Sequence, residues 1–143
     1  MINVKEITKA TPEVCNSIKT LLTDLTTRET GFDMLRLAEI VANPNTRLFV
    51  AYEGEEAVAT YTLVAVTSPT GTKVWIEDVV VGGRWQGRGF GRRVVADAID
   101  RSQSLWPQST VMLTSRPSRV AANHIYATML QKKETNVYVL KTE

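Results

Sequence analysis

The chain has 143 residues, of which 43% are hydrophobic and 22% charged, and its formal net charge is +2. This size and composition are typical of one soluble globular domain, expected here over residues 1–143, and the charge is too small to indicate nucleic acid as a partner. The single cysteine, Cys15, excludes an internal disulfide and suits a reducing, cytoplasmic location. We expect no membrane partner, since no apolar run is long enough to span a bilayer and no signal-peptide pattern is present.

The hydrophobic pattern then predicts both strands and helices along the chain. Thr11 and Pro12 mark the start of a first helix, and Asn43-Pro44 marks the end of a second. A turn at 53–56 between two apolar runs indicates a hairpin. The predicted elements, in order, are a strand at 2–7, helices at 12–25 and 33–42, strands at 48–52, 57–66 and 74–81, a helix at 92–104, a strand at 110–114, a helix at 118–130 and a closing strand at 136–140. This order predicts an α/β (α+β) fold.

A glycine-rich segment stands between the strand at 74–81 and the helix that follows it. It reads Gln86-Gly87-Arg88-Gly89-Phe90-Gly91. Closely spaced glycines indicate backbone that must approach something closely. The helix behind them directs its free N–H groups and the positive end of its dipole to the same place. The segment therefore predicts a pyrophosphate site, with a purely connecting turn as the alternative.

Two familiar phosphate loops do not fit this segment. A Walker loop requires Gly-Lys followed by Ser or Thr, whereas Arg92-Arg93 follow Gly91. A dinucleotide fingerprint has glycines at its first, third and sixth positions, whereas here they occupy the first, third and fifth. The spacing Gln/Arg-x-x-Gly-x-Gly instead resembles the acetyl-CoA pyrophosphate loop of the GNAT-type N-acyltransferases. The resemblance covers residues 76–81 and 84–91.

That resemblance implies a fold, a cofactor and a reaction. The GNAT fold has a mixed central sheet of about six or seven strands flanked by about four helices, and a splayed pair of strands holds acetyl-CoA. The reaction would transfer the acetyl group of acetyl-CoA to a primary amine of a small molecule or peptide, by direct attack in a ternary complex. The cofactor would contact Val79, Val80, Val81, Gln86, Gly87, Arg88, Gly89, Phe90, Gly91 and Arg92, with the Phe90 ring packed under the loop.

Glu77 and Asp78 stand side by side in a strand that we expect to be buried on both faces. Alternation would send one carboxylate to each face, and burial would raise its pKa. An amine that attacks a thioester must first lose a proton from its ammonium form, directly or through water. Glu77 is our candidate for that base and Asp78 is the second. A structural pair, bonded to backbone or arginine, is the alternative.

Asn123 and Tyr126 lie three residues apart, so they share one face of the last predicted helix. The run at 116–126 resembles the second motif of the GNAT superfamily. There the asparagine bonds the pantetheine arm of the coenzyme and the tyrosine protonates the departing thiolate. The resemblance assigns these roles to Asn123 and Tyr126, whereas without the motif Tyr126 would be a core residue with a surface hydroxyl. No spacing of His, Cys, Asp and Glu indicates a metal site.

The sequence departs from the family pattern in two places. Gly82-Gly83 stands where members commonly have a proline, which would make the start of the loop more mobile. The apolar-Gly-Phe turn that commonly follows the tyrosine is missing at 129–132. The missing turn leaves a second class of function open, namely a non-catalytic acetyl-CoA-binding sensor or regulatory module.

The acceptor and the oligomeric state also stay open. Residues 76–81 and Gln86-Gly87 resemble glucosamine-6-phosphate acetyltransferases as well, and Arg116 and Arg119 could bind the phosphate of such an amino sugar. A small-molecule or peptide amine is the more general prediction. An exposed strand at 137–140 could pair between subunits of a homodimer.

Overall fold

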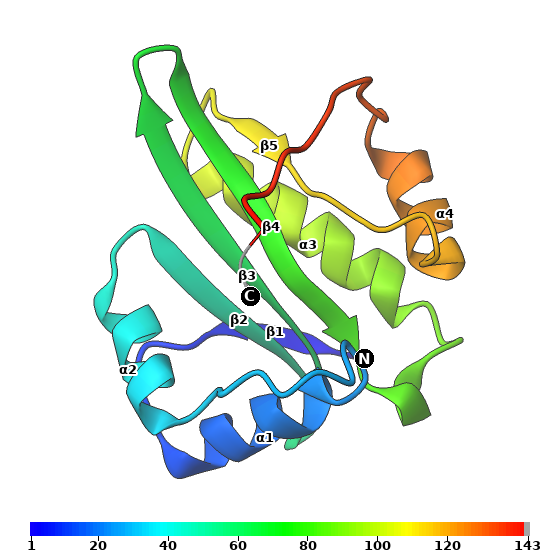
Figure 1. Ribbon diagram of the computed structural model, residues 1–143. Coiled ribbons are helices and arrows are strands. Elements are labelled where there is room, and N and C mark those ends of the chain that lie inside the picture. The colour runs from blue at the N-terminus through cyan, green and yellow to red at the C-terminus, as the bar shows by residue number, and fades with distance from the viewer. Residues whose placement is uncertain (142–143) are drawn as a thin grey trace.

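The protein is described by a computed structural model that covers residues 1–141. Five strands form one sheet in the order β1-β2-β3-β4-β5 (Figure 1). The first four strands pair antiparallel, and β5 runs parallel to β4. The strands are β1 (Asn3–Glu6), β2 (Thr46–Glu53), β3 (Glu56–Ser68), β4 (Gly71–Val81) and β5 (Thr110–Met112). This mixed sheet confirms the predicted α/β class.

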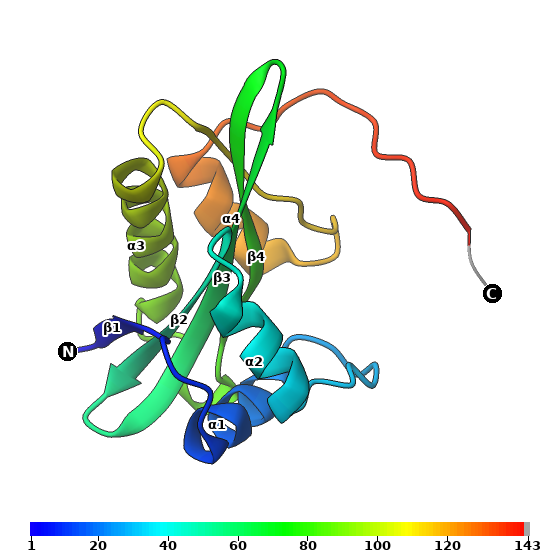
Figure 2. The same ribbon diagram turned by 90° about the vertical axis from the view of Figure 1, so that its left-hand side faces the viewer.

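Four α-helices and one 3-10 helix accompany the sheet. They are α1 (Pro12–Leu22), α2 (Met34–Ala42), α3 (Phe90–Leu105) and α4 (Val120–Met129), with the 3-10 helix η1 (Gly83–Trp85) directly after β4. Seen edge-on, α1 and α2 lie on one side of the sheet and α3 on the other (Figure 2). The side chains of Thr11 and Asp33 cap α1 and α2, each accepting a hydrogen bond from a backbone N–H three residues on.

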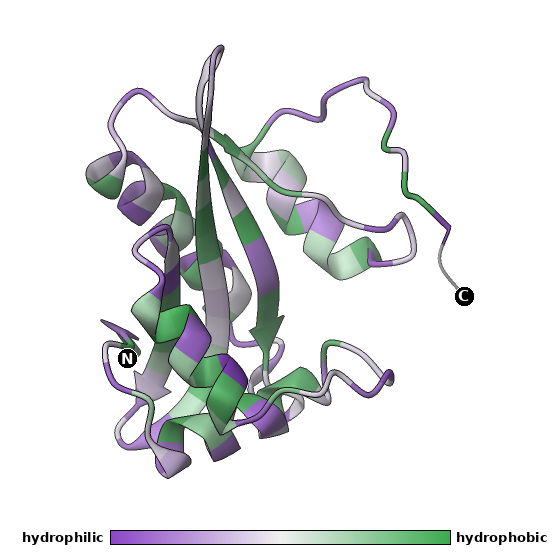
Figure 3. Ribbon diagram, turned by 60° about the vertical axis from the view of Figure 1, so that its left-hand side comes forward, coloured by the Kyte–Doolittle hydropathy of each residue, from purple (hydrophilic) through white to green (hydrophobic). Residues whose placement is uncertain are grey.

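The core has two layers, one on each face of the sheet. On the α3 face, Phe49, Tyr61 and Leu63 pack with Val94 and Ala98. On the α1/α2 face, a second cluster consists of Cys15, Ile18, Leu37, Leu48 and Val50. Apolar residues accordingly recur along the central strands in Figure 3. The two layers cover both faces of the sheet, and β5 forms one of its edges.

The sheet has five strands, fewer than the six or seven that the resemblance implied. The predicted closing strand at 136–140 was wrong, since residues 131–141 form no strand and are all exposed. The cap residue of α4, Leu130, has an extended backbone (φ −129°, ψ 159°), and the chain after it does not pair with the sheet. The missing Gly-Phe turn accounts for this difference, because residues 129–132 contain no glycine to form the turn of a closing hairpin.

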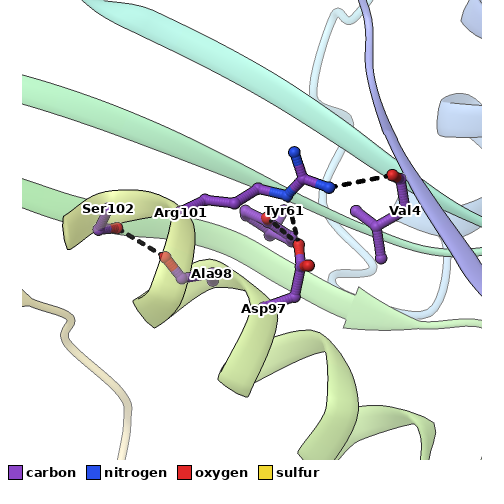
Figure 4. A network of polar contacts seen from close by, with 6 residues as sticks. All are labelled: Val4, Tyr61, Asp97, Ala98, Arg101 and Ser102. Atoms are coloured by element: carbon purple, nitrogen blue, oxygen red, sulfur yellow. Dashed lines mark hydrogen bonds and ion pairs between the residues drawn. The ribbon is translucent and has the colours of Figure 1, made fainter. Parts of the chain in front are cut away.

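A polar network fastens α3 to the sheet (Figure 4). The Tyr61 hydroxyl donates to Asp97 Oδ2 at 2.5 Å, and Arg101 Nε donates to the same oxygen at 2.8 Å. Arg101 also donates to the carbonyl of Val4 at 3.1 Å and lies 5.0 Å above the Phe49 ring. Burial, with the hydrogen bond to Asp97, raises the pKa of Tyr61, so the phenol stays protonated. The network ties α3 to β1, β2 and β3 at once.

This arrangement predicts unequal costs for removing its members. Tyr61→Phe leaves Asp97 paired with Arg101, so we expect a loss of about 1 kcal/mol in the free energy of unfolding. Asp97→Ala leaves the Tyr61 hydroxyl and Arg101 Nε without their shared acceptor. We therefore expect a loss of about 2 to 3 kcal/mol in the free energy of unfolding. Urea unfolding of both variants measures the two losses. Equal losses, or a larger loss for Tyr61→Phe, would contradict the network.

Candidate active site

The pairing between β4 and β5 is short. The two strands pair only from Lys73↔Thr110 to Trp75↔Met112. β4 then continues to Val81, whereas β5 has already ended. From Ile76 to Val81 one edge of β4 therefore lacks a strand partner among the described residues, and its backbone groups there can accept an extended ligand. This is the splayed pair of strands that the resemblance implied.

A bulge interrupts β4 within the splayed part. Thr62 pairs with Glu77 but Thr60 pairs with Val80, so one residue of β3 opposes two of β4. Asp78 has a left-handed backbone (φ +52°), an uncommon conformation for a residue other than glycine. The bulge shifts the alternation: Val74 and Ile76 face the α3 cluster before it, and Val79 and Val81 after it. The strand thus presents valines to α3 right up to its end.

The bulge corrects our expectation for the two acids. Alternation does not send one carboxylate to each buried face, because Asp78 occupies the bulge and both residues are exposed. Glu77 follows the α3-facing Ile76, so it lies on the α1/α2 face. Partial desolvation, and then the neighbouring charge of Asp78, raise the pKa of the Glu77 carboxyl despite the exposure of the residue. A raised pKa makes this carboxylate a better proton acceptor.

The glycine-rich loop presents open backbone to solvent. Gly87 and Gly89 have left-handed φ angles of +80° and +82°, and a Cβ added at either would meet nothing within 4 Å. The backbone conformation, not crowding within the chain, therefore requires glycine at both positions. The first helical hydrogen bond of α3 runs from Arg93 N to Gly89 O (3.3 Å), so the amides of residues 90–92 precede it. With no acidic residue in this first turn, the site suits an anion.

Several contacts hold the start of this loop in place. Asp24 Oδ2 accepts a hydrogen bond from Gly83 N at 2.9 Å, and Gln86 Nε2 donates to Val81 O at 3.0 Å. Trp85 is buried, with the guanidinium groups of Arg84 and Arg88 at 4.9 and 5.0 Å from its ring. The mobility expected from Gly82-Gly83 is thus opposed by a carboxylate from the segment after α1.

Sequence reasoning missed Asp24 and Trp85 as supports of the loop. Asp24 lies 59 residues from Gly83, so no local pattern indicates their contact. Packing also explains the glycine at position 82, because an added Cβ there would lie 3.2 Å from both Leu21 Cδ2 and Trp85 Cδ1. The only sequence signal was the pair of glycines itself, which indicates a close approach without naming the partner.

The helix α4 meets the loop at Gly91. A Cβ at Gly91 would lie 3.1 Å from Ile125 Cδ1 and 3.9 Å from Val81 Cγ2. The end of β4, the first turn of α3 and the middle of α4 therefore converge there, one residue from Tyr126. Arg92 Nη1 donates to Thr128 Oγ1 at 2.9 Å, so this predicted cofactor ligand also ties α3 to α4.

The two polar residues predicted on α4 have different surroundings. Asn123 is half-buried, and its Nδ2 donates to the carbonyl of Arg116 at 2.9 Å, which holds the turn before the helix. Tyr126 is also half-buried. Burial raises the pKa of its phenol, and Arg119 partly offsets this rise. Tyr126 and Glu77 lie on different sides of the sheet. Tyr126 belongs to α4, which packs on α3, whereas Glu77 lies on the α1/α2 face.

Two other findings concern metals and membranes. Within residues 1–141, no group of three or more His, Cys, Asp or Glu side chains could hold a metal ion. None of the helices in that range is both long and apolar enough to cross a membrane.

Comparison with known proteins identifies the family. Residues 14–130 match the model of the acetyltransferase (GNAT) family. The chain belongs to this family. It is therefore an acyltransferase by descent, and the resemblance noted in the loop and the last helix is confirmed at the family level. No curated protein matches the chain by sequence.

Solved structures agree with this family. A candidate acetyltransferase from Agrobacterium tumefaciens is 26% identical with a TM-score of 0.82, over 97% of this chain and 99% of that one. An aminoglycoside acetyltransferase from an uncultured soil metagenomic sample is 17% identical (TM-score 0.80; 99% and 96%). A glucosamine-6-phosphate N-acetyltransferase from Arabidopsis thaliana is 20% identical (TM-score 0.74; 99% and 99%). The last two show a shared fold.

The contact at Gly91 makes a prediction about the GNAT domain's stability. Gly91→Val would press a branched side chain into Ile125, so we expect a loss of about 1 to 3 kcal/mol in the free energy of unfolding. In an Ile125→Ala background the same change should cost less, because the opposing methyl is gone. Urea unfolding of the two single variants and the double variant measures this coupling. Strictly additive losses would show that Gly91 does not serve the α3–α4 contact.

Proposed function

We propose that this GNAT protein, as one domain over residues 1–143, transfers the acetyl group of acetyl-CoA to a primary amine of a small molecule or peptide. The observation that supports it most is the position of the free amides of α3 directly beside the free edge of β4. Free amides at a helix start bind anions, as the pyrophosphate of the coenzyme requires. A free strand edge binds extended amides, as the pantetheine arm requires. Structural neighbours include enzymes named for amine-bearing acceptors, an aminoglycoside and glucosamine-6-phosphate.

The residues present fit the donor substrate. The open backbone at Gly87 and Gly89 and the amides of the first turn of α3 would hold the pyrophosphate, with Arg88 adding charge. The edge at Val79–Val81 would pair with the amides of the pantetheine arm. A backbone N–H of the same edge would stabilise the oxyanion that develops on the thioester carbonyl. Asn123 retains its side-chain carbonyl as an acceptor for the same arm.

Glu77 and Tyr126 would move the protons. Glu77 accepts a proton from the acceptor ammonium, directly or through water, and Asp78 is the nearest substitute for it. The amine nitrogen then bonds the acetyl carbon while the carbon–sulfur bond breaks. Tyr126 donates its phenolic proton to the departing sulfur, and the second proton that the new amide nitrogen must lose leaves through water and restores the phenol. The raised pKa of Tyr126 keeps that proton in place at neutral pH until the thiolate forms.

A non-catalytic acetyl-CoA-binding sensor is the second candidate. The observation that favours it is the course of residues 131–141, which form no strand and do not pair with the sheet. Thiol release distinguishes the two functions. Turnover with any member of an amine library contradicts the sensor, whereas tight coenzyme binding with no thiol release from any amine would contradict the transferase.

Tyr126→Phe tests the acid. We expect turnover to fall by about 100-fold, the usual worth of general acid–base catalysis, while affinity for acetyl-CoA stays close to that of the parent. His124→Phe is the matched control, since this exposed residue lies on the same helix and should leave turnover unchanged. Thiol-release kinetics with calorimetric binding measure both effects. Full activity in Tyr126→Phe would remove its role as the acid.

Glu77→Gln tests the base through pH. Only the carboxylate accepts a proton, so kcat/KM of the parent should fall as the pH drops through the pKa of Glu77, which lies above the ordinary value for glutamate. The Gln variant should be slower and should lack this acid limb. Asp78→Asn, one residue on, should keep the limb. A Glu77→Gln profile that superimposes on the parent's would assign the base to Asp78 or to water.

A further inference from the structure

Two adjacent carboxylates on β4 have no cationic partner within the described part of the chain. Glu77 and Asp78 are both exposed, and neither forms an ion pair among residues 1–141. Glu6 and Asp97, by contrast, each pair with an arginine. Partial burial and then the charge of Asp78 raise the pKa of Glu77, so the two carboxylates repel each other. A cation from outside the chain would relieve this repulsion.

The fold itself does not explain this pair of acids. Neither side chain belongs to either of the two core clusters. Asp78 occupies the bulge with a left-handed backbone, which glycine adopts without strain, so the bulge needs no carboxylate. Two exposed acids alone indicate only a solvated surface. What they do here therefore depends on where they lie.

The pair lies on the splayed part of β4, in a chain that belongs to an acyltransferase family. The neighbours of Glu77 on the α1/α2 face are uncharged. Trp75 lies two positions earlier on β4, and Thr62 and Val64 of β3 pair with Glu77 and Trp75 respectively. Trp75 and Val64 are half-buried and lie outside both core clusters. This face of the site therefore combines two negative charges with a partly exposed apolar surface.

A single ammonium group cannot stay paired with both carboxylates during the reaction. Under the proposed function, on which this inference rests, the reacting ammonium gives its proton to Glu77, and both groups become neutral. Asp78 keeps its negative charge, and only a positive charge that does not react can remain beside it. A second ammonium on the acceptor supplies that charge. The alkyl chain between the two nitrogens can lie on Trp75 and Val64, as the stem of a lysine lies on apolar surface.

We propose that the acceptor is a small diamine or polyamine, with its reacting nitrogen at Glu77 and a second ammonium bound by Asp78. Asp78 is then a residue that determines acceptor specificity. The same charges disfavour glucosamine-6-phosphate, because two carboxylates would repel its phosphate. The charge of the acceptor, more than its shape, would decide which amines react.

Thiol-release kinetics with diaminobutane and butylamine, which share one carbon chain, test the second charge. In the parent, kcat/KM should be at least about fivefold higher for diaminobutane, and added salt should reduce this ratio. Asp78→Asn keeps the size of the side chain and its tolerance of a left-handed backbone. It should lower the ratio to the statistical factor that the two equivalent nitrogens of diaminobutane give. Asp100→Asn is the matched control, since this exposed carboxylate lies on α3, and it should keep the parent's ratio.

Three kinetic results would overturn the proposal and leave the proposed function standing. They are a parent ratio no higher than the statistical factor, a ratio that Asp78→Asn leaves unchanged, and a higher kcat/KM for glucosamine-6-phosphate than for diaminobutane. Absence of thiol release with all three acceptors would instead contradict the proposed function.

Calorimetric titration of the two amines into the CoA-loaded protein measures the same preference without turnover. Diaminobutane should bind the parent at least about fivefold more tightly than butylamine, and Asp78→Asn should remove the difference. Equal affinities of the parent for the two amines would overturn the proposal whether or not the protein turns over.

Discussion

The constraint on which the site depends is the unequal length of β4 and β5. A strand in the interior of a sheet must satisfy its backbone groups on both edges, but β4 loses its neighbour after Trp75 and continues to Val81. The bulge at Asp78 keeps the valines of this stretch packed toward α3 while its free edge remains open. An open backbone edge supported by a packed strand is a rigid place for an extended ligand to bind.

Packing then brings the first turn of α3, the proposed anion site, to the end of that edge. The contacts of Asp97 and Arg101 with β1, β2 and β3 fix α3 across the sheet, so its first turn stands next to Val81. Asp24 fixes the backbone between them, and Gly91 lets α4 approach both. Because each of these contacts involves a different element, the loop is held by the whole fold, although it contains few side-chain contacts of its own.

The sequence predicted the local parts of this site and missed the long-range ones. The glycine loop and the helix behind it could be predicted because their signal lies in adjacent residues. The bulge at Asp78 could not, because it depends on the register between β4 and β3 and reverses a prediction based on alternation. The bond from Asp24 to Gly83 joins residues with no shared pattern. The apolar run at 136–140 has high strand propensity, but the strand predicted there was wrong, because propensity alone supplies no partner for it.

The most direct test of the account is calorimetric titration of acetyl-CoA, with NAD as comparator, into the parent, Gly89→Val and Gly54→Val. Gly89 and Gly54 both have left-handed backbones and open space at Cβ, so the two variants share the same strain, but only Gly89 lies in the loop. We expect acetyl-CoA and not NAD to bind the parent and Gly54→Val, with loss of binding in Gly89→Val. A parent that fails to bind acetyl-CoA, or unchanged affinity in Gly89→Val, would contradict the assignment of the loop.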